Sequence, residues 1–257
     1  MKQLIASLAL LCLVPLTACA RGEPLLDVRV VDLDQGNTLT RIPYAGRDYV
    51  EGRPGHRFSV SLQNTTGERV LAVLSVDGVN AISGQTASAS QAGYVLEPWQ
   101  QVEIHGWRKS YSDIAEFYFT DLPDSYAART GRPVNVGVIG VAAFRERHPE
   151  PIAYEPSPMV APMAKAAAEN SASGAMASRD EASAPSATAQ QIGTGHGQRR
   201  YDPVTQTQFE RQSLRPNQQV ALYYDSHEAL VARGVISEWR YPQQPEPFPI
   251  GFVPDPR

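Results

Sequence analysis

Cysteine is nearly absent from this chain of 257 residues. Cys12 and Cys19 are the only two, and both lie within the first 20 residues. If that stretch is removed on maturation, or ends at a lipid-bearing Cys19, no pair of cysteines remains to form a disulfide. The same loss removes any thiolate for nucleophilic catalysis or metal binding, so we expect the stability of the mature chain to come from a packed core.

An excess of positive charge is also missing. The chain has 23 Lys and Arg residues against 27 Asp and Glu, which gives a formal net charge of −4. Proteins that bind nucleic acid need a basic face to neutralise phosphates. We therefore expect no nucleic-acid partner.

Short motifs that carry chemistry are lacking as well. No G-x-S-x-G elbow occurs, the carboxylates are scattered, and no close H-E-x-x-H spacing joins His56, His105, His148, His196 and His227. The glycine-rich string 193–200 lacks the Gly-Lys-Ser/Thr of a phosphate loop, and its composition favours a flexible exit from a linker. The sequence thus predicts no catalytic residue, no metal site and no cofactor. A hydrolase whose site assembles from distant residues is kept as an alternative.

What the chain does have is an N-terminal export signal. Lys2 is followed by an apolar run from Leu4 to Val14, then by Pro15 and mostly small residues up to Ala20. One positive charge and an apolar run too short to anchor in a bilayer are typical of a cleavable signal peptide. We predict that residues 1–20 direct export across the inner membrane of a bacterial cell.

Two processing routes are compatible with the end of this signal. Leu16-Thr17-Ala18-Cys19 is similar to a lipobox, in which Cys19 becomes the lipid-bearing first residue of a lipoprotein. Ala20, rather than Asp, then favours the periplasmic side of the outer membrane. Ala18-Cys19-Ala20 also satisfies the small-x-small rule for cleavage after Ala20, which would release a soluble periplasmic or secreted protein. Membrane contact is expected only through a lipid on Cys19.

Short alternating runs separated by Gly, Asp, Asn and Pro dominate residues 25–144. Strict or brief alternation, typical of half-buried strands, occurs at 28–30, 58–62 and 102–104. More continuous apolar runs, typical of central strands, occur at 70–76 and 134–141. Asp77-Gly78 predicts a type I′ hairpin between the 70–76 and 79–83 runs. The pattern as a whole predicts an all-β fold, a mainly antiparallel β-sandwich.

Composition and helix-capping residues predict the remaining elements of the chain and its division into segments. Capping residues and a terminal Gly favour short helices at 123–130 and 226–234, and strands are expected at 206–211 and 220–224. An Ala-, Pro- and Ser-rich stretch predicts a long disordered linker. The expected organisation is a sandwich domain at 21–150, the linker at 151–198, strands and a helix that pack back on the sandwich at 199–241, and a Pro-rich tail at 242–257.

Aromatic residues between positions 94 and 119 offer a candidate binding surface. Their faces could stack on sugar rings or pack against a protein, although most aromatics on strands fill a core. In Phe117-Tyr118-Phe119, neighbouring residues must face opposite sides of a strand. The candidate surface consists of Tyr94, Trp99, Trp107, Tyr111 and Tyr118.

Three strings within residues 56–145 carry a resemblance. They are Asp77-Gly78-Val79-Asn80-Ala81-Ile82-Ser83-Gly84, Gly93-Tyr94-Val95-Leu96 and Ile104-His105-Gly106-Trp107-Arg108. In these strings the chain resembles a group of uncharacterised proteobacterial envelope proteins. The resemblance implies export and a β-rich domain, and it implies no activity, ligand or catalytic residue.

These features favour a non-catalytic exported envelope protein whose sandwich binds another envelope protein or has a structural role. The alternative is a glycan-binding module that uses the aromatic residues on a polysaccharide. The hydrolase is the second alternative.

Overall fold

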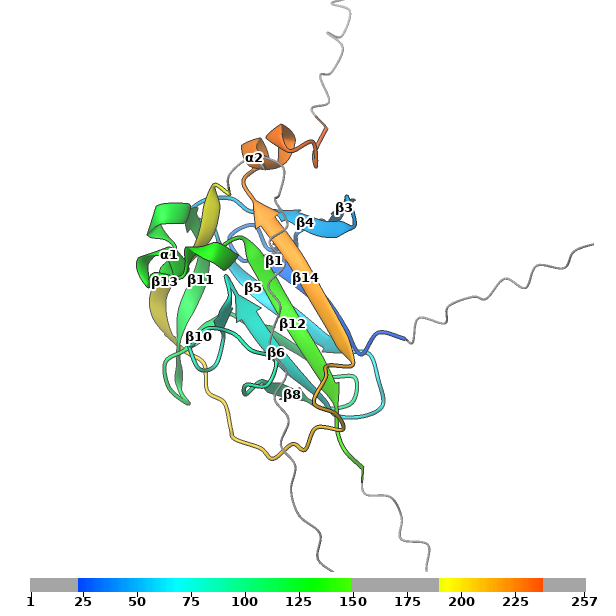
Figure 1. Ribbon diagram of the computed structural model, residues 1–257. Coiled ribbons are helices and arrows are strands. Elements are labelled where there is room, and N and C mark those ends of the chain that lie inside the picture. The colour runs from blue at the N-terminus through cyan, green and yellow to red at the C-terminus, as the bar shows by residue number, and fades with distance from the viewer. Residues whose placement is uncertain (1–22, 149–189, 238–257) are drawn as a thin grey trace, which may run out of the picture.

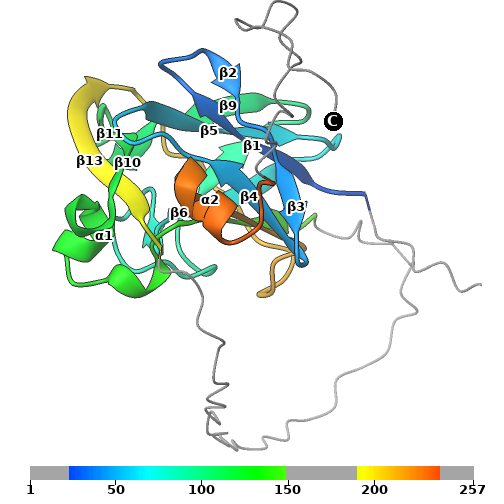
Figure 2. The same cartoon turned by 90° about the horizontal axis from the view of Figure 1, so that it is seen from above.

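The computed structural model describes residues 23–148 and 190–237, which form two packed β-sheets (Figures 1 and 2). The predicted signal peptide and tail, and most of the predicted linker, lie outside the described residues. Within the described part, no helix is long and apolar enough to cross a membrane.

Seven strands form the first sheet. β11 and β5 are central, and β1 lies between β5 and the edge strand β2. Both β5 and β10 pair with one edge of β11, and β13 pairs with its other edge. β9 pairs with β5. The strands are β1 (Leu26–Asp32), β2 (Asn37–Thr38), β5 (Arg57–Asn64), β9 (Gln101–Ile104), β10 (Gly106–Arg108), β11 (Asp113–Asp121) and β13 (Ile192–Tyr201).

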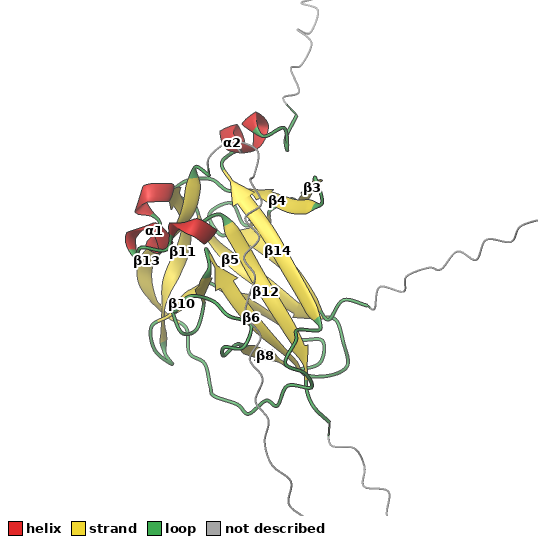
Figure 3. Cartoon of the chain, viewed as in Figure 1, coloured by secondary structure: helices red, strands yellow, loops and turns green. Residues whose placement is uncertain are grey.

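The second sheet has the order β3-β4-β14-β12-β6-β7, with β8 paired to β6. Every pair is antiparallel except β4 with β14, which is parallel. The strands are β3 (Ile42–Tyr44), β4 (Arg47–Glu51), β6 (Val70–Val76), β7 (Val79–Asn80), β8 (Tyr94–Leu96), β12 (Val138–Arg145) and β14 (Gln218–Asp225). The molecule is therefore an all-β sandwich, as the sequence predicted (Figure 3).

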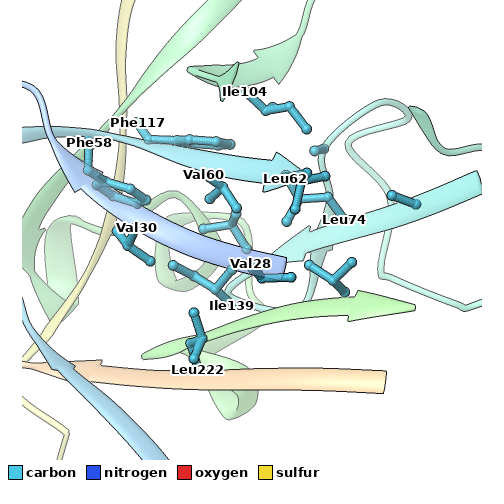
Figure 4. Close-up of a cluster of buried hydrophobic side chains, with 14 of the residues drawn as sticks. Val28, Val30, Phe58, Val60, Leu62, Leu74, Ile104, Phe117, Ile139 and Leu222 are labelled. Atoms are coloured by element: carbon cyan, nitrogen blue, oxygen red, sulfur yellow. The ribbon is translucent and has the colours of Figure 1, made fainter. Parts of the chain in front are cut away.

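The core lies between the sheets, where the period-2 pattern of each strand turns its apolar residues inward. Phe58, Val60 and Leu62 of β5 are fully buried, and the close-up in Figure 4 shows them beside residues of the facing sheet. The second sheet contributes Leu74, Ile139 and Leu222 to the same cluster. The alternation read from 58–62 thus fixes which face of the first sheet is apolar.

Local turn and cap signals are confirmed. Asp77 and Gly78 have φ values of 53° and 70°, and they close the hairpin between β6 and β7, as a type I′ turn requires. The two α-helices are α1 (Tyr126–Arg129), capped by Ser125, and α2 (His227–Ala232), capped by Ser226. Each serine hydroxyl accepts a hydrogen bond from a backbone N–H of the first turn.

Two predicted strands need correction. The run 134–141 becomes strand only from Val138, because Pro133–Asn135 forms a 3₁₀ turn (η2) that begins at a proline. No strand forms at 206–211, where the backbone makes an isolated bridge from Arg211 to Glu146. Arg69, just before β6, also donates to the carbonyl of Gln208. A second 3₁₀ turn, η1 (Leu122–Asp124), precedes α1.

The prediction that residues 193–200 form a flexible end of the linker is also wrong, because these residues belong to strand β13 (Ile192–Tyr201). The boundary of 198 for the linker is therefore too late. A Cβ added at Gly193 would lie 2.6 Å from the Cβ of Ser125, and one at Gly197 would lie 2.7 Å from the carbonyl oxygen of Glu116. The glycines allow close packing of a strand rather than flexibility.

Candidate functional site

A hollow of about 620 Å³ opens on the outer face of the first sheet, over β11 and β13. Phe117 and Phe119 point into the core, so Glu116 and Tyr118 on the same strand face outward. We call it the β11–β13 hollow; it is lined by Gly55, Arg57, Glu116, Tyr118, His196, Gly197 and Gln198.

Tyr118 lies in a row of paired residues that crosses three strands. Its register partners are Arg57 on β5 and Gly195 on β13, and paired residues share one face of a sheet. A Cβ added at Gly195 would lie 2.1 Å from the Cζ of Tyr118, so the phenol end of the ring covers this glycine. The glycine therefore lets the ring lean across β13.

Arg57 is held in place by Asp34. Its Nε and Nη2 atoms donate to Asp34 Oδ1 at 3.1 and 2.6 Å, and its backbone N–H donates to Oδ2 at 2.7 Å. The hydrogen bonds from Arg57 lower the pKa of the Asp34 carboxyl from its usual value. The edge of the guanidinium that carries Nε and Nη2 is thus held by Asp34, on the residue that pairs with Tyr118.

Glu116 is held from the opposite side of the hollow. Its side chain is only 11% exposed, and Arg200 Nη1 lies 3.5 Å from Oε1. The β11–β13 register shifts between Ala115 and Phe117, which places Gly197 directly against the Glu116 backbone. The bulge and the ion pair together orient the carboxylate.

The predicted aromatic surface does not form as one patch. Trp107 is 2% exposed and packs edge-on against Phe117 at 4.8 Å, so its assignment to a binding surface is wrong. Trp107 on β10 is paired with Ala115 of β11, and its ring lies in the same core cluster as Phe117. Tyr94 is half-buried with its hydroxyl 3.4 Å from Arg108 Nε, and burial raises the pKa of its phenol.

Trp99 and Tyr111 are exposed, at 65% and 68%. Trp99 lies between β8 and β9, where its backbone N–H donates to the carbonyl of Thr66, and Tyr111 lies in the turn between β10 and β11. Neither lines the β11–β13 hollow. Of the five candidates, the hollow contains Tyr118.

His105 is the histidine with the most carboxylate contacts. Its Nε2 lies 3.5 Å from Glu103 Oε2 and its Nδ1 lies 3.6 Å from Asp202 Oδ2, while Arg108 also binds Asp202. His105 lines neither the β11–β13 hollow nor a smaller hollow beside β1. Within residues 23–148 and 190–237, no group of three or more His, Cys, Asp or Glu side chains is placed to hold a metal ion.

The chain was compared with protein-family models, curated proteins and solved structures. None of them matches.

Sequence reasoning identified Tyr118 but missed the other polar side chains of the hollow. Alternation around Phe117 predicts that Tyr118 turns away from the phenylalanines, and it does. The same alternation predicts that Glu116 faces outward, so Glu116 could have been identified from the sequence. Arg57 and Gln198 could not be found, because their position depends on pairing between distant strands.

Proposed function

We propose that this protein is an exported, non-catalytic binding protein of the bacterial envelope, and that the β11–β13 hollow is its binding surface. The observation that carries the proposal is that three side chains of the hollow, Arg57, Glu116 and Tyr118, are held in place by neighbouring residues before any ligand arrives. Asp34 holds Arg57, Arg200 pairs with Glu116, and Gly195 seats the Tyr118 ring. Fixed side chains lose little entropy on binding, which favours affinity.

Binding accounts for this site better than hydrolysis does. The hollow presents an arginine, a carboxylate, an amide, an imidazole and a phenol, which are groups that orient a ligand through hydrogen bonds. The histidine with carboxylate neighbours, His105, lies outside the hollow. His196 lines the hollow, but among the described residues it makes no ion pair with a carboxylate, and Glu116 is paired with Arg200 instead. The hollow therefore holds no histidine–carboxylate pair that is arranged for acid–base catalysis.

Export is the second part of the proposal and is supported by residues 1–20. A lipid on Cys19 would hold the sandwich at the periplasmic side of the outer membrane, whereas cleavage after Ala20 would leave it soluble in the periplasm or secreted. In either case the hollow would face envelope components.

Site-specific photocrosslinking in intact cells tests the binding surface. A photoreactive amino acid at Gln198, in the hollow, should give a reproducible adduct with an envelope component on denaturing gels. The matched control is Gln219, an exposed glutamine on β14 of the other sheet. Equal adducts at both positions, or none at Gln198 in a folded and exported variant, would contradict the proposal.

A further inference from the structure

We infer that the ligand of the β11–β13 hollow contains an uncharged sugar ring that stacks on Tyr118. This inference rests on the proposed function, because it names the chemistry of the ligand for the same surface. It depends on three properties of the hollow: an aromatic ring in its lining, planar hydrogen-bonding groups around that ring, and neutralised charge.

The Tyr118 ring provides the face. The end of the ring that carries the hydroxyl covers Gly195 on β13, while the side chain as a whole is half-buried and lines the hollow. An aromatic surface supported from behind by a strand offers contact area at low entropy cost. The C–H groups on one face of a pyranose ring suit such a surface.

The side chains around the ring match hydroxyl groups. Arg57 donates, the Glu116 carboxylate accepts, and the Gln198 amide does both. Adjacent sugar hydroxyls both donate and accept, so they can satisfy such a mixed set. A hollow of about 620 Å³ also lies within the range of roughly 300–1,000 Å³ that is usual for small-ligand sites.

The charges of the hollow are balanced within the protein. The Arg57 guanidinium lies 2.6 Å from Asp34 Oδ1, and the Glu116 carboxylate lies 3.5 Å from Arg200. Neither charge needs a counter-ion from the ligand. The hollow should therefore prefer a neutral ring to an acidic sugar or an amino sugar, since an added charge would be desolvated without a free partner.

Saturation-transfer NMR on the mature full-length protein tests the inference. The probes are the methyl glycosides of glucose, galactose, mannose and N-acetylglucosamine, with glucuronic acid and glucosamine as charged comparisons. At least one neutral probe should receive saturation and bind more tightly than both charged probes. Tyr118→Ala should weaken its binding about tenfold or more, which corresponds to about 1.4 kcal/mol.

Matched variants separate loss of the site from loss of the fold. Tyr111→Ala removes a tyrosine that is 68% exposed and lies outside the hollow, and it should leave binding unchanged. Tyr118→Phe keeps the ring and should retain most of the affinity, and urea unfolding should show that each variant remains folded.

Two results would overturn the sugar inference. One is the absence of saturation transfer to every neutral probe at millimolar concentration. The other is equal weakening by Tyr111→Ala and Tyr118→Ala. If Gln198 crosslinks reproducibly to a protein while no sugar binds, the sugar inference fails and the proposed function stands. If neither sugars nor crosslinks appear, both fail.

Discussion

The buried carboxylate of Asp77, in the turn between β6 and β7, binds β13, β14 and the residue that precedes β12. Its Oδ1 accepts hydrogen bonds from the Gly137 N–H at 2.9 Å and the Tyr224 hydroxyl at 2.5 Å, and its Oδ2 accepts one from the Thr194 N–H at 2.7 Å. The residue is 1% exposed. Burial raises the pKa of the carboxyl to about 6, against the lowering effect of these donors, and burial also raises the pKa of the Tyr224 phenol.

Asp77→Asn should destabilise the fold at pH 8 by about 1–3 kcal/mol. Asparagine tolerates the positive φ at this turn and can still accept at one oxygen. Its NH₂ group, however, would face the Thr194 N–H, which leaves a buried donor without an acceptor. Urea unfolding of the wild type and the variant measures the difference.

The same pair of proteins should show a pH dependence. The folded-state pKa of Asp77 lies above the unfolded value, so the folded state holds the proton more tightly. This contribution is fully present below the unfolded pKa of 3.8 and is lost as the pH rises through about 6. The stability of the wild type relative to Asp77→Asn should therefore be greater at pH 4.5 than at pH 8, by on the order of 2–3 kcal/mol. An unchanged difference would show that the carboxyl titrates as in the unfolded chain.

The sequence predicted the turn at Asp77 and Gly78 but not the hydrogen bonds of the buried Asp77 carboxylate. Asp77-Gly78 is a local signal for positive φ, and it is confirmed. The donors at Gly137, Thr194 and Tyr224 are distant in sequence, so nothing near Asp77 distinguishes it from a solvent-exposed turn carboxylate.

The sequence did not predict β13 as a strand, and its glycines explain why. Strands rarely contain alternating glycines, because glycine loses more backbone entropy than other residues and packs no side chain. Here Gly193, Gly195 and Gly197 lie against Ser125, Tyr118 and Glu116. The loss of entropy is offset by close approach of neighbouring elements, which composition alone does not reveal.

Gly197→Ala should therefore destabilise the fold by about 1–3 kcal/mol, because its Cβ would meet the backbone carbonyl of Glu116 at 2.7 Å. Gly67→Ala is the matched control: its Cβ would have an ordinary contact, with Trp99 Cζ2 at 3.9 Å. This control should change stability by no more than about 1 kcal/mol. Thermal or urea unfolding of both variants measures the contrast, and equal effects would contradict the close-packing explanation of β13.

Elements with local signals were predictable, and elements that depend on distant pairing were not. Alternation at 58–62 located β5, and Ser226 located the start of α2. The capping residues from position 123 placed α1 three residues too early, since this helix begins at Tyr126. The parallel pairing of β14 with β4, which sets Tyr224 beside Val50, depends on contacts across most of the chain. The hollow shares this dependence, because β5, β11 and β13 each contribute to it.

At the scale of the whole molecule, residues 190–237 complete both sheets. β13 extends the first sheet beyond β11, and β14 joins β12 to β4 in the second. Ile192, Leu222 and Tyr224 from this part are buried in the same cluster as the N-terminal strands. The sandwich and its hollow are therefore built from both parts of the chain around one core. If Cys19 carries a lipid, that anchor would also position the hollow.

Whether the mature protein has a lipid anchor depends on the processing of Cys19. If the lipobox is used, the wild-type protein should incorporate radiolabelled fatty acid in a bacterial host, and its mature N-terminus should be a modified Cys19 by mass spectrometry. Cys19→Ser should lose the label, because the acylated thiol is gone. Both proteins should still fold, since the first described residue, Glu23, lies beyond the cleavage site. If neither protein takes up label and the mature chain begins at Arg21, the lipid anchor is refuted and the sandwich is released after Ala20.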